Sequence, residues 1–295
     1  MPILSIRHVT TYHYHQPVVF GEHRMMLRPR DDGDQKVLES ELEITPRPKE
    51  LAWTQDNFGN HVATAAHFED RAAELRFVSR IRLMHDTIGF RASDIADYAR
   101  TYPFAYAADD EPNLERYVLR PSRRSELDRW SGQFFRADGS ADTHGLLVNI
   151  TQTLRRTFSH RPRHEAGIQK PVHTLELGSG SCRDLAVLMI AVLRSRGLAA
   201  RFVSGYLHLA DDDEDVAGGN THAWVQVYVP GPGWVDFDPS AGIVGNHKLI
   251  RVAVVHDPRE AVPLQGTWYG SATDHLAMTV AVKVRAASGA GEQVL

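Results

Sequence analysis

Residues 222–238, HAWVQVYVPGPGWVDFD, constrain the fold most, because they contain two alternating runs joined by a Pro-Gly-Pro-Gly turn. Alternation along a strand sends successive side chains to opposite faces. In the first run small apolar side chains share one face, and the other face carries His222, Trp224, Gln226 and Tyr228. A tight turn makes the two runs antiparallel neighbours. The sequence therefore predicts an antiparallel sheet with one apolar face toward a core.

The same hairpin brings a histidine and two carboxylates close together. If the pairing centres on Gly231 and Pro232, the partner of Asp238 lies in the mid-220s, and His222 is a diagonal neighbour beyond it. A bulge or a loop shift would bring the imidazole to the carboxylate. Asp236 lies on the same face as Asp238, so spacing alone lets either residue orient His222.

The chain has one cysteine, Cys182, and it precedes an amphipathic segment. A helix is predicted there, ending at the C′ residue Gly197. Its apolar stripe comprises Leu185, Leu188, Met189, Val192 and Leu193. A helix N-terminus stabilises a thiolate, and its free N–H groups suit an oxyanion. The alternative interpretation makes Cys182 a small buried apolar residue.

A nucleophilic cysteine requires a base, and the base requires a group that orients it. The chain offers these in the order Cys182, His222 and then Asp238 or Asp236. Each residue alone is a weak signal, because a histidine at a strand start and an Asp-Pro turn are both common. Together, on a helix start and a strand hairpin, they predict a catalytic cysteine.

Three stretches, GSCRDLAVLMIAVLRSRGLAARFVSGYL, THAWVQVYV and GWVDFDPS, resemble the transglutaminase-like superfamily, in particular its bacterial cysteine-hydrolase branch. The resemblance implies that Cys182 is the nucleophile, His222 the base and Asp238 the orienting residue. It also implies a papain-like α+β core, with the cysteine helix packed on an antiparallel sheet. The family chemistry needs no metal and no organic cofactor.

The first part of the chain favours β-structure, with alternating runs in ILSIRHVTTYHYH, KVLESELEITPRP and ELRFVSRIRLM. YHYHQPVVFGEHRMMLRPR, LEITPRP and DNFGN resemble the β-rich N-terminal module of the bacterial branch. We therefore expect an antiparallel β-sandwich-like module over residues 1–94, a catalytic core over 95–287 and a flexible tail over 288–295.

Within the core, three segments favour helices: SDIADYART, DTHGLLVNITQTLRRTF and PSRRSELDRWSGQFF, the last with Pro121 and Ser122 as helix-start residues. AARFVSGYL and the late run LAMTVAVKV favour strands. The acidic run at residues 211–215 favours a solvated loop, and it also suggests a preference for basic substrates.

Composition and charge limit the kinds of partner and the compartment that we expect. The formal net charge is −4 and no basic stripe occurs, so nucleic acid is not expected as a partner. No apolar window reaches the length of a membrane span, and polar residues interrupt the N-terminus before a signal-length apolar run. A single cysteine forms no internal disulfide, which suits a reducing compartment. We expect a cytoplasmic protein; whether it is a homo-oligomer is left open.

The resemblance implies acyl transfer from an amide or peptide substrate through a thioester, with hydrolysis favoured over cross-linking. A second hypothesis is a catalytically idle peptide- or protein-binding module that retains the fold. A third makes Cys182 a redox sensor; it is the weakest, because the chain has no second cysteine to resolve a sulfenic acid.

Overall fold

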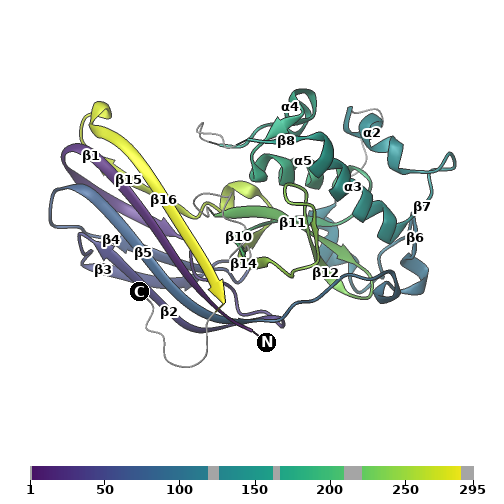
Figure 1. Ribbon diagram of the computed structural model, residues 1–295, viewed down its shortest axis with the longest axis horizontal. Helices are drawn as coiled ribbons and strands as arrows, with labels where there is room; N and C mark the ends of the chain where they lie inside the picture. The colour runs from purple at the N-terminus through teal and green to yellow at the C-terminus, as the bar shows by residue number, and fades with distance from the viewer. Residues whose placement is uncertain (1, 119–125, 162–166, 209–220, 287–295) are drawn as a thin grey trace.

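The computed structural model describes residues 2–118, 126–161, 167–208 and 221–286, and contains two antiparallel sheets with helices beside the second (Figure 1). The predicted α+β class is confirmed: a sandwich-like N-terminal module is followed by helices packed on an antiparallel sheet. The first sheet consists of β1 (Ile3–Met25), β2 (Gln35–Thr45), β3 (Glu50–Gln55), β4 (His61–Ala66), β5 (Ala72–His85), β15 (Leu264–Tyr269) and β16 (His275–Ala286).

Strand β1, 23 residues long, organises the N-terminal module. Its first half pairs with β5 and β16, and its second half pairs with β4 and β15. The register shifts between His13 and Val18, where β1 passes from one half-sheet to the other. Apolar side chains fill the space between the half-sheets, among them Tyr14, Phe20, Met25, Phe68, Leu75 and Phe77.

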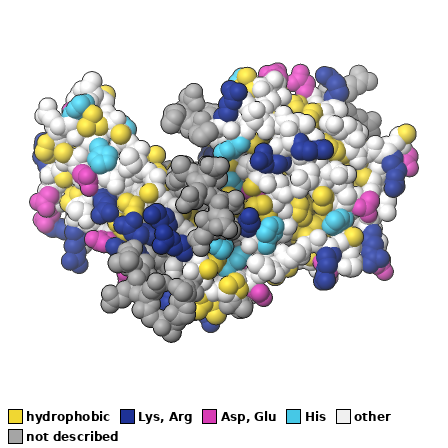
Figure 2. Space-filling view, in the orientation of Figure 1, with side chains coloured by type: hydrophobic (Ala, Val, Ile, Leu, Met, Phe, Trp, Pro, Cys, Tyr) yellow, Lys and Arg dark blue, Asp and Glu magenta, His cyan; other side chains and the backbone are white. Residues whose placement is uncertain are grey.

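The outer face of the β5–β1–β16 half-sheet is basic. Arg7 pairs in register with Arg80 on one side and Lys283 on the other, and Ser5 with Arg82 and Arg285. Figure 2 shows Lys and Arg side chains gathered over these strands. The sequence contains no basic stripe because this face is assembled from three separate strands.

The core sheet has the order β13-β12-β11-β10-β14. Its strands are β10 (Ala200–Leu207), β11 (His222–Val229), β12 (Gly233–Asp238), β13 (Ile243–Val244) and β14 (Leu249–Val255). The helices are α1 (Glu111–Leu114), α2 (Glu126–Ser131), α3 (Thr143–Thr157), α4 (Pro171–Leu177) and α5 (Cys182–Ser195). Short strand pairs add β6 (Thr101–Tyr102) with β7 (Ala141–Asp142), and β8 (Ser159–His160) with β9 (Ser179–Gly180).

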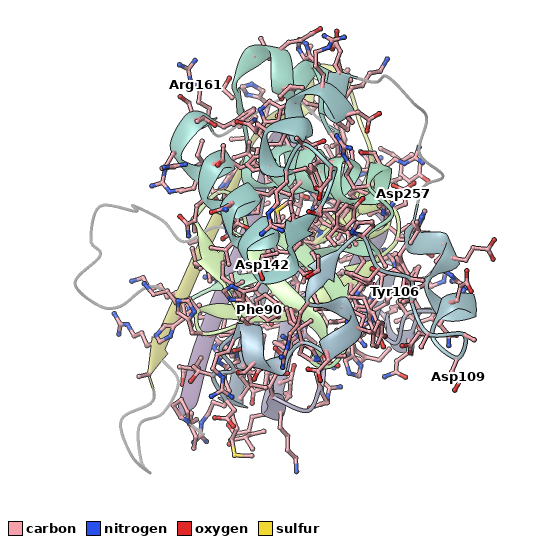
Figure 3. All side chains as sticks on the ribbon, turned by 90° about the vertical axis from the view of Figure 1, so that its right-hand side faces the viewer. Phe90, Tyr106, Asp109, Asp142, Arg161 and Asp257 are labelled. Carbon is pink, nitrogen blue, oxygen red and sulfur yellow. The ribbon has the colours of Figure 1, made fainter. Side chains whose placement is uncertain are left out.

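Helix α5 packs on β10 and β11 through the predicted apolar stripe, which is buried throughout. The helix ends as expected, because Gly197 has a φ of 76°, a left-handed conformation that favours glycine. Helix α3 adds its buried face of Leu146, Leu147, Ile150 and Leu154 to the same core, also as predicted. In Figure 3, Phe90 lies just below Asp142, the N-cap residue of α3.

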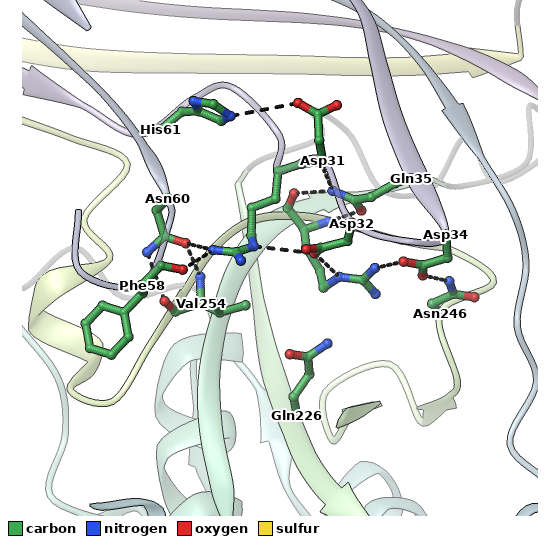
Figure 4. Close-up of polar contacts among 12 residues, drawn as sticks. Asp31, Asp32, Asp34, Gln35, Phe58, Asn60, His61, Gln226, Asn246 and Val254 are labelled. Carbon is green, nitrogen blue, oxygen red and sulfur yellow. Dashed lines mark hydrogen bonds and ion pairs between the residues drawn. The ribbon is translucent and has the colours of Figure 1, made fainter. Parts of the chain in front are cut away.

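A buried polar cluster joins the N-terminal module to the core (Figure 4). Arg251 of β14 forms ion pairs with Asp32 and Asp34 of the module and with Asp236 of β12. Gln35 donates to the carbonyl oxygen of Arg251 and accepts from its backbone nitrogen. Arg251, Asp34 and Asp236 are almost completely desolvated, whereas the Asp32 side chain is 29% exposed, so the buried partners depend on one another.

Two expectations about the core are wrong, and three others concern residues outside the described ranges. Strands β15 and β16 pair with β1 and therefore belong to the N-terminal sheet, and β16 contains the run LAMTVAVKV. Residues 95–287 thus do not form one core. SDIADYART forms two 3-10 turns and the strand β6 instead of a helix. Pro121, Ser122, the acidic run at 211–215 and the tail at 288–295 lie outside the described residues. Among those described, no helix is long and apolar enough to cross a bilayer.

Candidate active site

Cys182 is the first residue of α5, directly after the N-cap residue Ser181. Asp184 completes a capping box: its Oδ2 accepts from the Ser181 backbone nitrogen at 3.0 Å and from the Ser181 hydroxyl at 2.8 Å. Its Oδ1 accepts from the Gln169 backbone nitrogen at 2.8 Å. Asp184 therefore fixes the start of the helix, and Cys182 sits partly exposed at its positive end.

The structure brings His222 and Asp238 together: Nε2 of His222 lies 2.6 Å from Oδ2 of Asp238. The other carboxylate oxygen of Asp238 accepts from the Ser240 backbone nitrogen, the Ser240 hydroxyl and the Ala241 backbone nitrogen at 2.8, 2.7 and 3.1 Å. The β11–β12 register is regular up to Val225 opposite Phe237. The bulge considered from the sequence is not needed, because the two side chains span the diagonal themselves.

Asp236 bonds to residues other than His222, so Asp238 is the carboxylate that contacts His222. Its Oδ1 accepts from the indole Nε1 of Trp224 at 2.6 Å, and its Oδ2 pairs with Arg251 at 2.8 Å. Trp224 in turn stacks on His222, with ring centroids 6.2 Å apart. A Cβ on Gly205 would lie 2.6 Å from the Trp224 ring, so only glycine at this position admits the indole. Asp236 thus supports the ring on which His222 rests.

The two tryptophans of the β11–β12 hairpin, Trp224 and Trp234, have different surroundings. Trp224 is fully buried beneath His222. Trp234, near the start of β12, makes an edge-to-face contact with Tyr117 and lies under the guanidinium of Arg201. It lines a separate cavity of about 230 Å³ beside the Arg251 network.

The ionisation of Cys182 and His222 is strongly coupled. Burial alone would raise the pKa of the Cys182 thiol, but hydrogen bonds with His160 and His222 and the charge of His222 lower it to about 6. Burial would lower the pKa of His222, but the charge and hydrogen bond of Asp238, together with Cys182, raise it to about 10. Near neutral pH the pair is therefore a thiolate and an imidazolium.

His160 is a site residue that the sequence did not reveal. It lies on β8, which pairs in parallel with β9 so that His160 is opposite Gly180. This pairing brings its imidazole within hydrogen-bonding reach of the Cys182 thiol, and the side chain stays exposed. No local pattern marks it, because a two-residue strand has no periodicity and its partner lies 20 residues further along the chain.

Two family models match this chain. Residues 4–83 match the bacterial transglutaminase-like N-terminal region, and residues 135–239 match the transglutaminase-like superfamily. The second match contains Cys182, His222 and Asp238.

Relatives extend these matches over the chain. An uncharacterized protein of Mycobacterium leprae (strain TN) is 25% identical over 286 residues, which is 95% of this chain and 98% of the relative. A protein-glutamine gamma-glutamyltransferase of Pseudomonas aeruginosa is 32% identical over 117 residues, 35% of this chain and 17% of that protein. A crystal structure of a Cytophaga hutchinsonii protein, named as a candidate cysteine protease, superimposes with a TM-score of 0.71 and 19% identity. That likeness covers 99% of this chain and 92% of the other, and shows the fold.

Proposed function

Because this chain belongs to the transglutaminase-like superfamily, we propose that it is a cysteine-dependent amide or peptide hydrolase or acyltransferase that works through a thioester. Cys182 is the nucleophile, His222 the acid and base, and Asp238 the residue that orients His222. The observation that carries the proposal is the 2.6 Å contact between His222 and Asp238 beside a thiol whose pKa is lowered to about 6.

The ring geometry assigns a role to each nitrogen of His222. Nε2 is engaged by Asp238, so Nδ1 is the nitrogen that faces the thiol. A carboxylate on Nε2 holds the ring in one orientation and stabilises its protonated form. The three donors on the far oxygen of Asp238 keep that carboxylate ionised, consistent with the lowered pKa of Asp238: burial opposes this direction, and the charge of His222 outweighs it.

The reaction proceeds in two halves. The Cys182 thiolate attacks the amide carbonyl carbon, a C–S bond forms, and the carbonyl oxygen becomes an oxyanion. The imidazolium of His222 gives its proton to the amide nitrogen, the C–N bond breaks and the amine leaves. Water then attacks the thioester while His222 accepts one of its protons; the C–S bond breaks, releasing the carboxylic acid and restoring the thiolate.

The oxyanion needs hydrogen-bond donors near the sulfur. The backbone N–H of Cys182 is available at the start of α5, where helical N–H groups have no partner within the helix. His160 is the side-chain donor that we assign to the same position, because it reaches the sulfur from β8 and is exposed to a substrate. Hydrolysis is favoured over cross-linking, since water needs no second binding site.

Iodoacetamide labelling of Cys182 across pH, in the wild type and in His222→Ala, tests the proposal. The single cysteine makes the mass change unambiguous. We expect rapid labelling with an inflection near pH 6 in the wild type, displaced by the substitution toward about 8.5, the value of a free thiol. Labelling that occurs only after denaturation would contradict the proposal and favour the idle binding module. Digestion of a peptide mixture, analysed by mass spectrometry against Cys182→Ala, then separates hydrolysis from transfer to an added amine.

A further inference from the structure

A cavity of about 460 Å³ lies between the N-terminal module and the core, and it is lined by the chain neighbours of two reactive residues. Arg183 and Thr221 line it, and these residues directly follow Cys182 and directly precede His222. Opposite them lie side chains of β1 and β16. Figure 1 shows β16 along the side of the N-terminal module that faces the core. The cavity volume is in the range of ligand pockets.

The polar side chains at the floor of this cavity hydrogen-bond to one another and to the backbone. Tyr206 donates its hydroxyl proton to the Leu27 carbonyl at 2.8 Å, so it accepts from Nδ1 of His8 at 3.1 Å. The other ring nitrogen, Nε2 of His8, then accepts from the Thr10 hydroxyl at 3.0 Å. Burial lowers the pKa of His8 to about 4, so the ring is neutral at physiological pH. The floor offers a ligand neither a charge nor a free donor.

The walls are apolar. Ile168, Val262, Pro263, Leu264, Met278 and Val280 line the cavity. Two of them continue outward along β16: Val280 is partly buried and Met278 is 52% exposed, and Leu276, further along the strand, is 50% exposed. Exposed large apolar side chains that continue an apolar cavity wall are a feature of ligand grooves.

Among the described residues, the only charged groups that line the cavity are two arginines. Arg183 holds the wall in place, because its guanidinium donates to the carbonyls of Pro258 and Ala261 at 2.8 and 3.0 Å. Arg259 lies at the exposed rim and pairs with Asp257. Within the part of the chain that the structure describes, no Asp or Glu lines the cavity. A cationic side chain would therefore meet two arginines and no carboxylate among these lining residues, whereas an aliphatic one would meet the apolar wall.

We propose that this cavity is the subsite for a branched aliphatic side chain of the substrate, and that the N-terminal module supplies one of its walls. The inference rests on the proposed function, because it requires Cys182 to be the attacking residue. It selects against lysine and arginine side chains at this subsite. That choice is opposite to the preference for basic substrates suggested by the acidic run at residues 211–215.

Chloroacetamides that differ only in the N-substituent test the proposal without a known substrate. The probes are N-methyl-, N-(3-methylbutyl)- and N-(4-aminobutyl)chloroacetamide, and glutathione gives their intrinsic reactivity. In each case the sulfur displaces chloride, so that a C–S bond forms and the C–Cl bond breaks. We expect the 3-methylbutyl probe to label Cys182 at least about tenfold faster than the methyl probe after correction by glutathione, because its extra methylene groups become buried. The aminobutyl probe should show no such gain.

Met278→Lys and Leu276→Lys form a matched pair of substitutions, because both side chains lie on β16 and are about half exposed. Met278 lines the cavity and Leu276 does not. Met278→Lys should lower the ratio of 3-methylbutyl to methyl labelling by about tenfold, whereas Leu276→Lys should leave it unchanged. Equal ratios on the protein and on glutathione, or equal effects of the two substitutions, would overturn the subsite. Slow labelling by the methyl probe itself would instead contradict the activated thiolate, so the two failures are distinguishable.

Discussion

His222 and Asp238 contact each other at 2.6 Å although they are not paired residues in the β11–β12 ladder. Asp238 follows Phe237, which is opposite Val225, so His222 lies on the diagonal. The contact depends on the Asp-Pro-Ser turn, because Ser240 and Ala241 donate to the second oxygen of Asp238 and set the direction of the first. The turn after β12 is therefore part of the proposed catalytic arrangement.

Asp238→Asn should reduce turnover by about 10³-fold or more, since a neutral amide no longer stabilises the imidazolium. The pKa of Cys182 should rise, because His222 would no longer be held in its charged form. The loss of that positive charge affects the thiolate more than the loss of the repulsion from Asp238. Peptide turnover and iodoacetamide labelling against pH measure both effects. Ser240→Ala is the matched control: the two backbone donors remain, so its effect should be severalfold at most. Similar losses in both variants would mean that Asp238 acts only in folding.

The activity should depend on pH with a broad maximum. Below pH 6 the thiol is protonated and the nucleophile is lost, so kcat/KM should fall as the pH decreases through about 6. Above pH 10 the imidazolium loses the proton that the leaving amine requires, so kcat/KM should fall again. A rising limb centred near pH 8.5, where a free thiol ionises, would contradict the ion pair.

His160→Ala should shift the inflection of Cys182 labelling to higher pH, because one hydrogen bond to the thiolate is lost. It should also lower kcat by about 10²-fold with little change in KM, as expected for an oxyanion donor. His173→Ala, which removes a histidine exposed on α4, serves as the control. Retention of kcat together with a shifted inflection would limit His160 to stabilising the thiolate.

Arg251→Met should destabilise the protein by about 3 to 5 kcal/mol, because it leaves Asp34 and Asp236 buried without their cation. Urea denaturation measures the free energy of unfolding. Arg82→Met is the control, since the Arg82–Glu39 pair lies at the surface and should contribute less than about 1 kcal/mol. Equal losses in the two variants would mean that the buried network does not hold the module to the core.

The sequence predicted those elements whose pattern is local. The α5 stripe, the α3 stripe and the β11–β12 hairpin each follow from side-chain periodicity, and the structure contains all three. The choice between Asp236 and Asp238 needed the structure, because both lie on one face and only their partners differ.

Long-range pairing was not predictable from the pattern. The run LAMTVAVKV favoured a strand, but periodicity carries no information about its partner, which is β1 almost the whole chain away. The same limit hid His160, whose place depends on two residues of parallel pairing. Neither strand length nor alternation specifies which edge a strand will join.

Because β1 pairs with β16, the N-terminal sheet is completed only after the core strands have been synthesised. A ribosome releases Cys182, His222 and Asp238 well before residues 275–286, so the nascent chain holds the reactive thiol before Met278 and Val280 reach the cavity beside it. Until then, one edge of β1 is open to pairing with any other strand. The proposed subsite is therefore complete only after residues 275–286 have been synthesised and β16 has paired with β1.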